Sequence, residues 1–249
     1  MRLYSLGFTI LLLALTAAAQ PGTQPYRAPR TSDGKPDLQG FWQALNTASF
    51  NVEPHSPALG IPAGLGIVVD PPDGKIPYKP EAAAKQQENF RNRAAADPLR
   101  KCFSPGVPRM MYLPFPFQII QTPKFIAITS EYAHTVRNIN FEGQHLADLD
   151  FWMGDSRGHW EGDTLVVDVT SNNDETWFDA AGNFHSDALH VVERYTRSEP
   201  DVLTYEATIE DPKVFTKPWK ISMPLYRHKE KNFRLLEYEC QAYAEEEQK

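Results

Sequence analysis

The sequence lacks several features that mark common functional classes. It has no basic run, and its formal net charge is −7, which argues against nucleic-acid binding because a phosphate backbone requires a concentrated basic face. No Gly-rich phosphate loop follows a predicted strand, which argues against nucleotide binding. The metal motifs HExxH and CxxC are also missing, which argues against the best-marked zinc proteins. The letters of the nucleophile-elbow motif GxSxG occur once, at Gly154–Gly158. However, its Ser156 would face away from Asp155 and His159 on a regular strand, which argues against a classical hydrolase.

Long apolar runs are missing except at the N-terminus. Residues 1–2 give a short basic start, 6–17 form an apolar run, and small residues lead up to Ala19. This is the pattern of a secretory signal peptide, and the run is too short to span a bilayer, which takes roughly 20 apolar residues. We expect 1–19 to be removed after Ala19, leaving an exported protein, periplasmic or extracellular, without an integral membrane segment.

Cysteine is scarce, because Cys102 and Cys240 are the only two in the chain. An exported protein meets an oxidising compartment, where disulfides persist. The two residues are either joined or form two buried free thiols, since spacing alone does not establish the geometry of a disulfide. A bridge would tie the loop before the main β region to the last predicted strand.

The mature chain divides into zones of different composition. Residues 20–36 are predicted to be a flexible linker, 37–111 a loop-rich wrapper, and 112–249 an antiparallel β domain, with 37–249 forming one structural unit. Within the wrapper, about 80–96 is predicted to be a helix, because Pro stands in its first turn and helix formers follow. Phe90 is its only large apolar residue, which predicts a surface helix.

Short segments rich in β-branched and aromatic residues, separated by turn residues, predict about nine strands. Most connections are short, so neighbouring strands should be antiparallel. A meander of this length must protect its edges, which favours a lipocalin-like barrel or a two-sheet sandwich. The predicted strands are 118–122, 124–132, 135–141, 151–160, 164–171, 188–197, 202–210, 219–228 and 232–240.

The segment FWMGDSRGHWEGDTLVVDVT is predicted to be a hairpin. Because side chains alternate along a strand, Asp155, Arg157 and His159 share one face. A two-residue turn at Glu161-Gly162 would pair Asp155 with Asp168, whereas a three-residue bulged turn would not. We expect the polar row to form a site if its face points into the barrel.

A polar, aromatic connection over 173–187 and several isolated groups supply further candidates. Arg offers a planar donor fork, His moves a proton near neutral pH, and Trp suits a hydrophobic cavity, although each also occurs in turns, ion pairs and cores. The candidates for catalysis are Asp155, Arg157, His159 and His185. The candidates for ligand contact are Tyr132, His134, Arg137, Trp152, Trp177, His190 and Arg194.

A metal site is a weaker hypothesis. His185, His190 and Glu193 carry suitable donor atoms, but their spacing is unspecific. His190 and Glu193 should also face opposite sides of one strand. We therefore expect no cofactor and interpret His190 as a packed or hydrogen-bonded strand histidine.

Two resemblances accompany these patterns. The segment Asp37-Leu38-Gln39-Gly40-Phe41-Trp42 resembles the G-x-W strand opening of lipocalin-type calycins, whose barrels hold small ligands. The segments WMGDSRGHWEGDTLVVDVT, WFDAAGNFHSDALHVVERYTR and YEATIEDPKVFTKPW resemble an uncharacterised family of exported bacterial proteins. The second resemblance covers about 102–240 and implies one domain, but it implies no activity and no catalytic residues.

The sequence therefore predicts an exported β-barrel that binds a small organic molecule. We expect Asp155, Arg157, His159, His185 and His190 to line its cavity. If the protein is an enzyme of lyase, isomerase or hydrolase type, His159 or His185 would be the general acid or base, oriented by Asp155, and Arg157 would hold an anionic group. The alternatives are a non-catalytic ligand carrier, an envelope interaction module, and a metal-dependent enzyme using His185 and His190.

Overall fold

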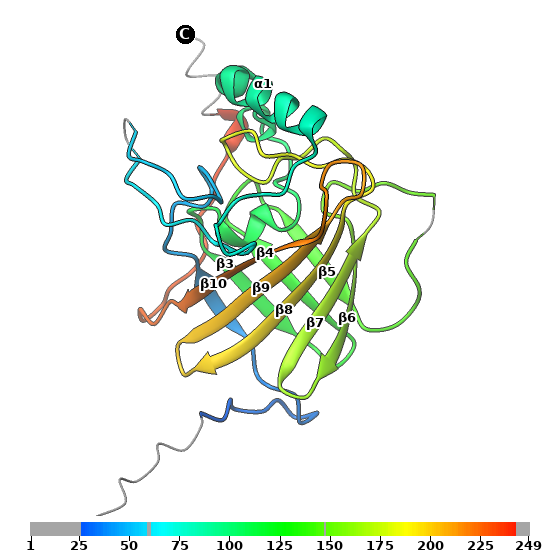
Figure 1. The fold of residues 1–249 in the computed structure, drawn as a ribbon. Coiled ribbons are helices and arrows are strands. Elements are labelled where there is room, and N and C mark those ends of the chain that lie inside the picture. Colours follow the sequence, from blue (N-terminus) through cyan, green and yellow to red (C-terminus); the bar gives the residue numbers. More distant parts are fainter. Residues whose placement is uncertain (1–25, 59–60, 147, 243–249) are drawn as a thin grey trace, which may run out of the picture.

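The computed structural model describes residues 26–58, 61–146 and 148–242. Nine strands of a ten-stranded sheet close into a barrel, because β1 pairs with both β3 and β10, and β2 (Val68–Asp70) pairs with β10 alone (Figure 1). The predicted barrel is confirmed. Its strands are β1 (Gly40–Gln43), β3 (Phe117–Gln121), β4 (Phe125–Ser130), β5 (Val136–Asn140), β6 (Asp155–Glu161), β7 (Thr164–Thr170), β8 (His190–Glu199), β9 (Val202–Glu210) and β10 (Trp219–Arg227).

Alternating burial along the strands explains why the sheet curls around one core. In β8 and β9 every second side chain is buried, as expected when one face of a sheet is packed and the other is solvated. Large aromatic side chains fill the interior. Among those that are at most 1% exposed are Trp42, Phe117, Tyr195, Tyr205 and Trp219.

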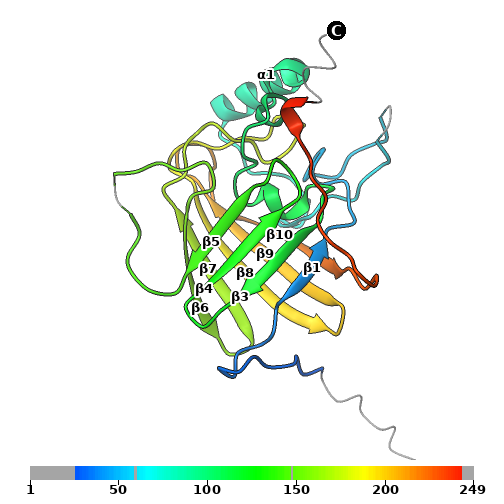
Figure 2. The same cartoon turned by 180° about the vertical axis from the view of Figure 1, so that it is seen from behind.

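The strand that closes the barrel is not the predicted one. Trp42 of β1 pairs with Phe117 on one side and with Arg227 on the other. The segment 232–240, predicted as the last strand, makes only an isolated bridge between Tyr238 and Tyr132. It runs along the outside of the barrel toward α1 instead (Figure 2). The prediction failed because the seam between β3 and β10 is already occupied by β1.

One pair of neighbouring strands is parallel, in an otherwise antiparallel barrel. β5 and β6 pair only through Ile139↔Ser156 and Asn140↔Arg157. The described parts of the connection, 141–146 and 148–154, lie beside the barrel, and the second part returns the chain to the end from which β5 started (Figures 1 and 2). Because the chain must cross back along the barrel, β6 starts at Asp155 and not at the predicted 151.

Helix α1 (Pro80–Ala96) lies across one end of the barrel together with the short helices η1 (Pro98–Lys101) and η2 (Arg109–Tyr112) (Figure 1). The predicted surface helix is confirmed, since only Ala82 and Asn89 are buried in it. The Asn89 side chain donates to the Gly182 carbonyl at 3.2 Å. This contact fixes the helix to the long connection between β7 and β8.

A disulfide joins Cys102 to Cys240 across 138 residues of sequence, so the bonded alternative is confirmed and the free-thiol alternative is wrong. The bond attaches the C-terminal segment to the end of η1. The predicted signal peptide, 1–19, lies outside the described residues. Within the predicted linker 20–36, Arg30 bridges to Pro36 and pairs with Asp163 at 2.8 Å. Across 26–58, 61–146 and 148–242, no helix is long and apolar enough to cross a membrane.

Candidate functional site

The β6–β7 hairpin has a different register from the predicted one. Its turn is Gly162-Asp163, so Glu161 pairs with Thr164, Arg157 with Asp168, and Asp155 with Thr170. Gly162 has φ +59°, the left-handed conformation that tight two-residue hairpin turns require. The predicted pairing of Asp155 with Asp168 is therefore wrong by two residues. Asp168 pairs with Arg157 instead, so the two carboxylates are not directly opposite each other, where they would repel.

The polar row of β6 lies on the outside of the barrel. Asp155, Arg157 and His159 share one face as predicted, but the opposite face, with Ser156 and Gly158, points inward. A Cβ on Gly158 would lie 2.7 Å from an Ile139 methyl carbon, so the interior has no room for a side chain there. The expectation that the polar row lines the barrel cavity is wrong, because packed hydrophobic side chains occupy the interior.

A buried ion pair lies inside the barrel between β5 and β8. The Arg137 guanidinium donates to both carboxylate oxygens of Glu193, twice to Ser156 Oγ at 3.0 Å, and to Tyr195 Oη at 3.5 Å. All five N–H groups of the guanidinium are thus used. Burial lowers the pKa of Arg137, but the facing Glu193 carboxylate outweighs it and holds the pKa above its ordinary value. Arg137 is a structural cation with no donor left for a ligand.

Glu193 organises the polar groups of the interior. It is fully buried, and Tyr205 Oη donates to its Oε1 at 2.7 Å while Tyr195 Oη donates at 3.0 Å. Burial raises the pKa of both phenols, and the adjacent Glu193 carboxylate raises it further. The phenols stay protonated and serve as donors.

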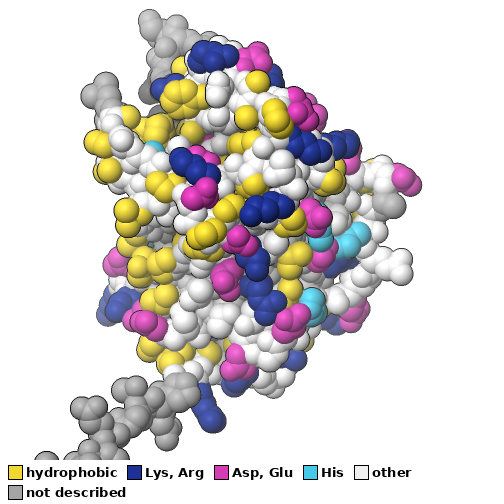
Figure 3. Space-filling view, in the orientation of Figure 1, with side chains coloured by type: hydrophobic (Ala, Val, Ile, Leu, Met, Phe, Trp, Pro, Cys, Tyr) yellow, Lys and Arg dark blue, Asp and Glu magenta, His cyan; other side chains and the backbone are white. Residues whose placement is uncertain are grey.

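Histidine and carboxylate side chains contact one another in a series on the outer face of the barrel. This series, which we call the outer chain, consists of Asp155, His145, Asp168 and His190. His145, from the connection before β6, places Nδ1 3.2 Å from Asp155 Oδ2 and Nε2 2.9 Å from Asp168 Oδ1. His190 Nε2 lies 3.0 Å from the other oxygen of Asp168. Figure 3 shows histidine side chains beside acidic ones on the side of the barrel formed by β6, β7 and β8. A neutral imidazole has one N–H and an imidazolium has two, so His145 donates to one of the two carboxylates in its neutral form and to both in its protonated form.

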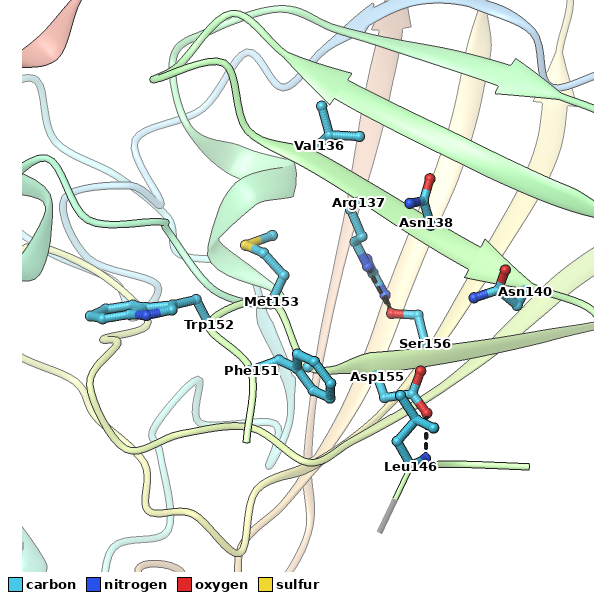
Figure 4. Close-up of a pocket in the computed structure, with 11 residues that line it drawn as sticks. Val136, Arg137, Asn138, Asn140, Leu146, Phe151, Trp152, Met153, Asp155 and Ser156 are labelled. Carbon is cyan, nitrogen blue, oxygen red and sulfur yellow. Dashed lines mark hydrogen bonds between the residues drawn. The ribbon is translucent and has the colours of Figure 1, made fainter. Parts of the chain in front are cut away.

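A groove of about 340 Å³ opens between β5 and the segment that leads into β6. It exists because β5 and β6 pair over so few residues and then diverge. Figure 4 shows Arg137 reaching across its floor to Ser156, with Asn138 and Asn140 on the β5 side and Phe151 and Asp155 opposite. The groove is lined by Val136, Arg137, Asn138, Asn140, Leu146, Phe151, Trp152, Met153, Gly154, Asp155 and Ser156.

Asp155 belongs to both the groove and the outer chain. The residue is 8% exposed, and its Oδ2 accepts from the Leu146 backbone N–H at 2.9 Å and from Arg157 Nη2 at 3.1 Å, besides its contact with His145. Its Oδ1 has no hydrogen bond to any other described residue and points toward β5 (Figure 4). A ligand in the groove would therefore meet a fixed carboxylate oxygen.

Several predicted site residues lie away from this groove. His159 is on the exposed outer wall, where it and Arg194 both contact Glu161. His134 pairs at the surface with Glu239 at 2.7 Å. Tyr132 is buried, and its hydroxyl donates to the Leu99 carbonyl at 3.1 Å. These residues support the surface or the packing near the disulfide.

His185 is a buried structural residue in the connection between β7 and β8. Its Nε2 lies 2.7 Å from Thr176 Oγ1, and its Nδ1 lies 2.9 Å from the Ser186 carbonyl. The carbonyl can only accept, so Nδ1 carries the proton and Nε2 accepts from Thr176. Burial lowers the pKa of His185, which keeps it neutral. Trp177, half-buried, bridges to Phe184 in the same connection.

The three weak metal candidates do not converge. His190 is on the outer wall, Glu193 is inside the barrel, and His185 is held by Thr176 and Ser186. Among the residues that the structure describes, no group of three or more His, Cys, Asp or Glu side chains is arranged to hold a metal ion. The idea of a metal-dependent enzyme using His185 and His190 therefore has no geometric basis.

Of the predicted site residues, Arg137, Trp152 and Asp155 line the groove. Arg157 contacts Asp155 from outside the lining, and His190 is connected to Asp155 through Asp168 and His145. Sequence reasoning missed Asn138, Asn140, His145 and Phe151. The alternation in VRNIN could have placed both asparagines on the outer face of a strand. His145 stands in a connection without any pattern, so only the fold could bring it to Asp155.

Comparison with known proteins adds no identity to this geometry. No family model and no curated protein matches the chain. The resemblance to a family of exported bacterial proteins stays a prediction. The chemistry of the groove is therefore the basis for assigning a function.

Proposed function

We propose that the protein binds a small organic molecule in the groove between β5 and β6. One observation carries the proposal: a single cavity combines an unpaired oxygen of the buried Asp155, two side-chain amides and an apolar wall. Small-molecule sites are typically cavities of about 300 to 1,000 Å³ with a few convergent polar groups. The ligand would lie in the barrel wall, whereas a lipocalin-type barrel holds its ligand inside.

The test is a thermal-shift screen of a chemically diverse small-molecule library against the disulfide-bonded protein. A ligand that binds only the folded state raises its melting temperature. Asn138→Trp, on the exposed side of β5, would fill the groove. Glu206→Trp, at an exposed position on β9 three strands from β6, is the matched control.

We expect stabilising compounds whose effect disappears in Asn138→Trp and persists in Glu206→Trp. If no compound shows this dependence on the groove, the proposal is wrong. In that case an envelope interaction module becomes the leading alternative.

The proposal includes export. The Cys102–Cys240 disulfide supports an oxidising compartment, and the predicted cleavage after Ala19 lies outside the described residues. Expression of the full chain in an exporting bacterial host, followed by N-terminal sequencing, tests this part. We expect the mature protein to start at Gln20 and to be recovered outside the cytoplasm, whereas an intact N-terminus would contradict export.

Acid–base catalysis is a second candidate, which the connection between the groove and the outer chain favours. Asp155 would exchange a proton with the ligand through Oδ1, while His145 and Arg157 hold Oδ2 and position the carboxylate. His145 continues to Asp168 and His190, which could pass a proton to solvent. In this proposal His145 and Arg157 are positioning residues, and His159 and His185 have no catalytic role.

The catalyst and the carrier differ in their response to Asp155→Asn. To test for catalysis, each ligand found in the screen is incubated with the protein, and the mixture is analysed for a product. We expect Asp155→Asn to abolish conversion even at ligand concentrations that saturate the weaker binding of the variant, and His145→Gln to alter the pH profile of the rate. If no ligand is converted and Asp155→Asn only weakens binding, the protein is a carrier.

A further inference from the structure

We infer that the groove selects a polyhydroxylated ring without an anionic group, such as a saccharide unit. This inference rests on the proposed function and names the ligand class for the same site. It follows from four properties of the lining: the N–H groups of Arg137 are all bonded, one carboxylate oxygen is unpaired, two amides are unpaired, and an aromatic ring faces the cavity.

Arg137, which lines the groove, has no capacity for an anionic ligand, because it uses all five N–H groups on Glu193, Ser156 and Tyr195. Arg157 is not part of the groove lining, and it donates through Nε and Nη2 to Asp155 and through Nη1 to the Glu142 carbonyl at 2.9 Å. An anionic ligand would meet the unpaired Asp155 oxygen, and the lining offers no free arginine N–H group to balance it, so like-charge repulsion disfavours it.

The polar groups that remain match hydroxyl groups. Asp155 Oδ1 is an acceptor held in place by the bonds to Oδ2, so it orients an incoming O–H donor. The side chains of Asn138 and Asn140 make no hydrogen bond with any other part of the described chain, and each offers both a donor and an acceptor. The two asparagines are two residues apart on β5 and therefore project from the same face. Hydroxyls on successive ring carbons present donors and acceptors in this mixed way.

The Asp155 side of the groove supplies an apolar surface. The Phe151 ring points into the groove beside Asp155 (Figure 4) and has no aromatic partner among the described residues. Met153 and Leu146 extend the apolar lining. Trp152 lies farther out, against Phe103 with ring centroids 4.8 Å apart. A ring with an apolar C–H face and polar edges could stack on Phe151 and keep its hydroxyls on Asn138, Asn140 and Asp155.

The experiment is a titration of the disulfide-bonded protein with each probe compound. Binding is measured by calorimetry and by NMR of the added compound. The neutral probes are D-glucose, D-galactose, N-acetyl-D-glucosamine, cellobiose and maltose. D-glucuronate and D-glucosamine are the charged probes, and benzamide and indole are the apolar probes without hydroxyls. Asn140→Ala and Asp155→Asn remove polar groups of the groove, and Asn92→Ala on exposed α1 is the matched amide control.

We expect at least one neutral saccharide to bind, and glucuronate to bind at least about tenfold more weakly than glucose. Each groove variant should weaken saccharide binding about tenfold, the effect of losing one or two hydrogen bonds to the ligand, and Asn92→Ala should leave it unchanged. The variants are checked for an unaltered melting temperature, so that a folding defect is recognised. Phe151→Leu, which keeps an apolar side chain, should weaken saccharides and leave the fold intact.

Tighter binding of glucuronate than of glucose would overturn the inference. So would saccharide binding that is insensitive to Asn140→Ala and Asp155→Asn. If no saccharide binds but benzamide, indole or a library compound binds in a manner that Asn138→Trp abolishes, the ligand class is wrong and the proposed function stands. If no compound of any class shows that dependence, both fail.

Discussion

Asp179 is a buried carboxylate at the end of the barrel covered by α1. It is 0% exposed, and its oxygens accept from the backbone N–H groups of Val52, Ala181 and Asn183 and from the Asn183 side chain at 2.6 Å. Burial raises its pKa to about 7, although the hydrogen bond from Asn183 acts in the opposite direction. It therefore organises the β7–β8 connection and also makes stability depend on pH.

The raised pKa of Asp179 predicts that stability falls as pH rises from about 4 to about 7. In this range the unfolded chain releases the Asp179 proton while the folded protein still binds it, so the unfolded state gains relative to the folded one. The contribution is fully present below the ordinary pKa of 3.8 and is lost as pH passes about 7. Its size is up to about 4 kcal/mol at about 1.4 kcal/mol per pKa unit.

Urea unfolding at a series of pH values tests this in the wild type and in Asp179→Asn. The variant loses the titrating group, so its free energy of unfolding should fall less between pH 4 and 7 than that of the wild type. This holds even if the loss of a hydrogen-bond acceptor destabilises the variant at every pH. Equal pH dependence of the two proteins would show that Asp179 keeps its ordinary pKa.

The Arg137–Glu193 pair predicts non-additive substitutions. Arg137→Met leaves a buried carboxylate without its cation, and Glu193→Leu leaves a buried cation, so each should cost about 3 to 5 kcal/mol of the free energy of unfolding. The double variant should cost less than the sum, because neither charge remains. Arg194→Met on the exposed pair with Glu161 is the control and should cost at most about 1 kcal/mol. Additive losses in the urea-unfolding cycle would contradict a coupled pair.

At the scale of elements, the disulfide holds the C-terminal segment against the end of the barrel. Tyr238 of this segment packs on Phe115 with ring centroids 4.7 Å apart and on Tyr132 at 5.7 Å. No continuous strand pairing fixes the segment, because its contact with Tyr132 is an isolated bridge. The covalent bond therefore compensates for missing sheet hydrogen bonds.

Replacing both Cys102 and Cys240 by Ser should lower the free energy of unfolding by about 2 to 5 kcal/mol, because the unfolded chain loses a long cross-link. Trypsin should also cut faster near Lys231 and Arg234 in the folded variant, since the segment can detach. Unfolding curves and timed digestion measure the two effects. A variant with wild-type stability and digestion would mean that the aromatic contacts alone hold the segment.

For the whole molecule, closure of the barrel depends on a four-residue strand. Trp42 of β1 is 0% exposed, its indole N–H donates to the Leu38 carbonyl at 3.0 Å, and the Arg227 guanidinium lies 5.6 Å from its ring. Trp42 also pairs with Phe117 of β3 and Arg227 of β10, so one residue joins the core to both neighbouring strands. A short strand with this anchor can replace the longer pairing expected from a complete meander.

Trp42→Ala should destabilise the protein by about 3 to 5 kcal/mol through loss of buried contacts and the cavity left behind. Amide hydrogen exchange along β3 and β10 should accelerate most next to β1, because the seam opens there. Trp152→Ala, at the half-buried groove position, should cost less. Uniform acceleration over all strands would indicate global unfolding without local opening of the seam.

The barrel was predictable to a large extent because alternation is a local property. Strands such as 202–210 and 219–228 show buried and exposed residues in turn, and short turns force antiparallel neighbours. Helix 80–96 was predictable from its Pro start and its polar surface. The closing strand and the parallel β5–β6 pair were not, since both depend on which distant segments meet.

The candidate site was predictable only in part for the same reason. The sequence by itself determined that Asp155, Arg157 and His159 share one face of a strand, because side-chain alternation follows from backbone geometry. Only the tertiary structure decided that this face points outward, that His145 reaches Asp155, and that Arg137 forms a buried ion pair with Glu193. Each of these contacts joins residues whose proximity is set by barrel closure and crossover, and no local pattern encodes it.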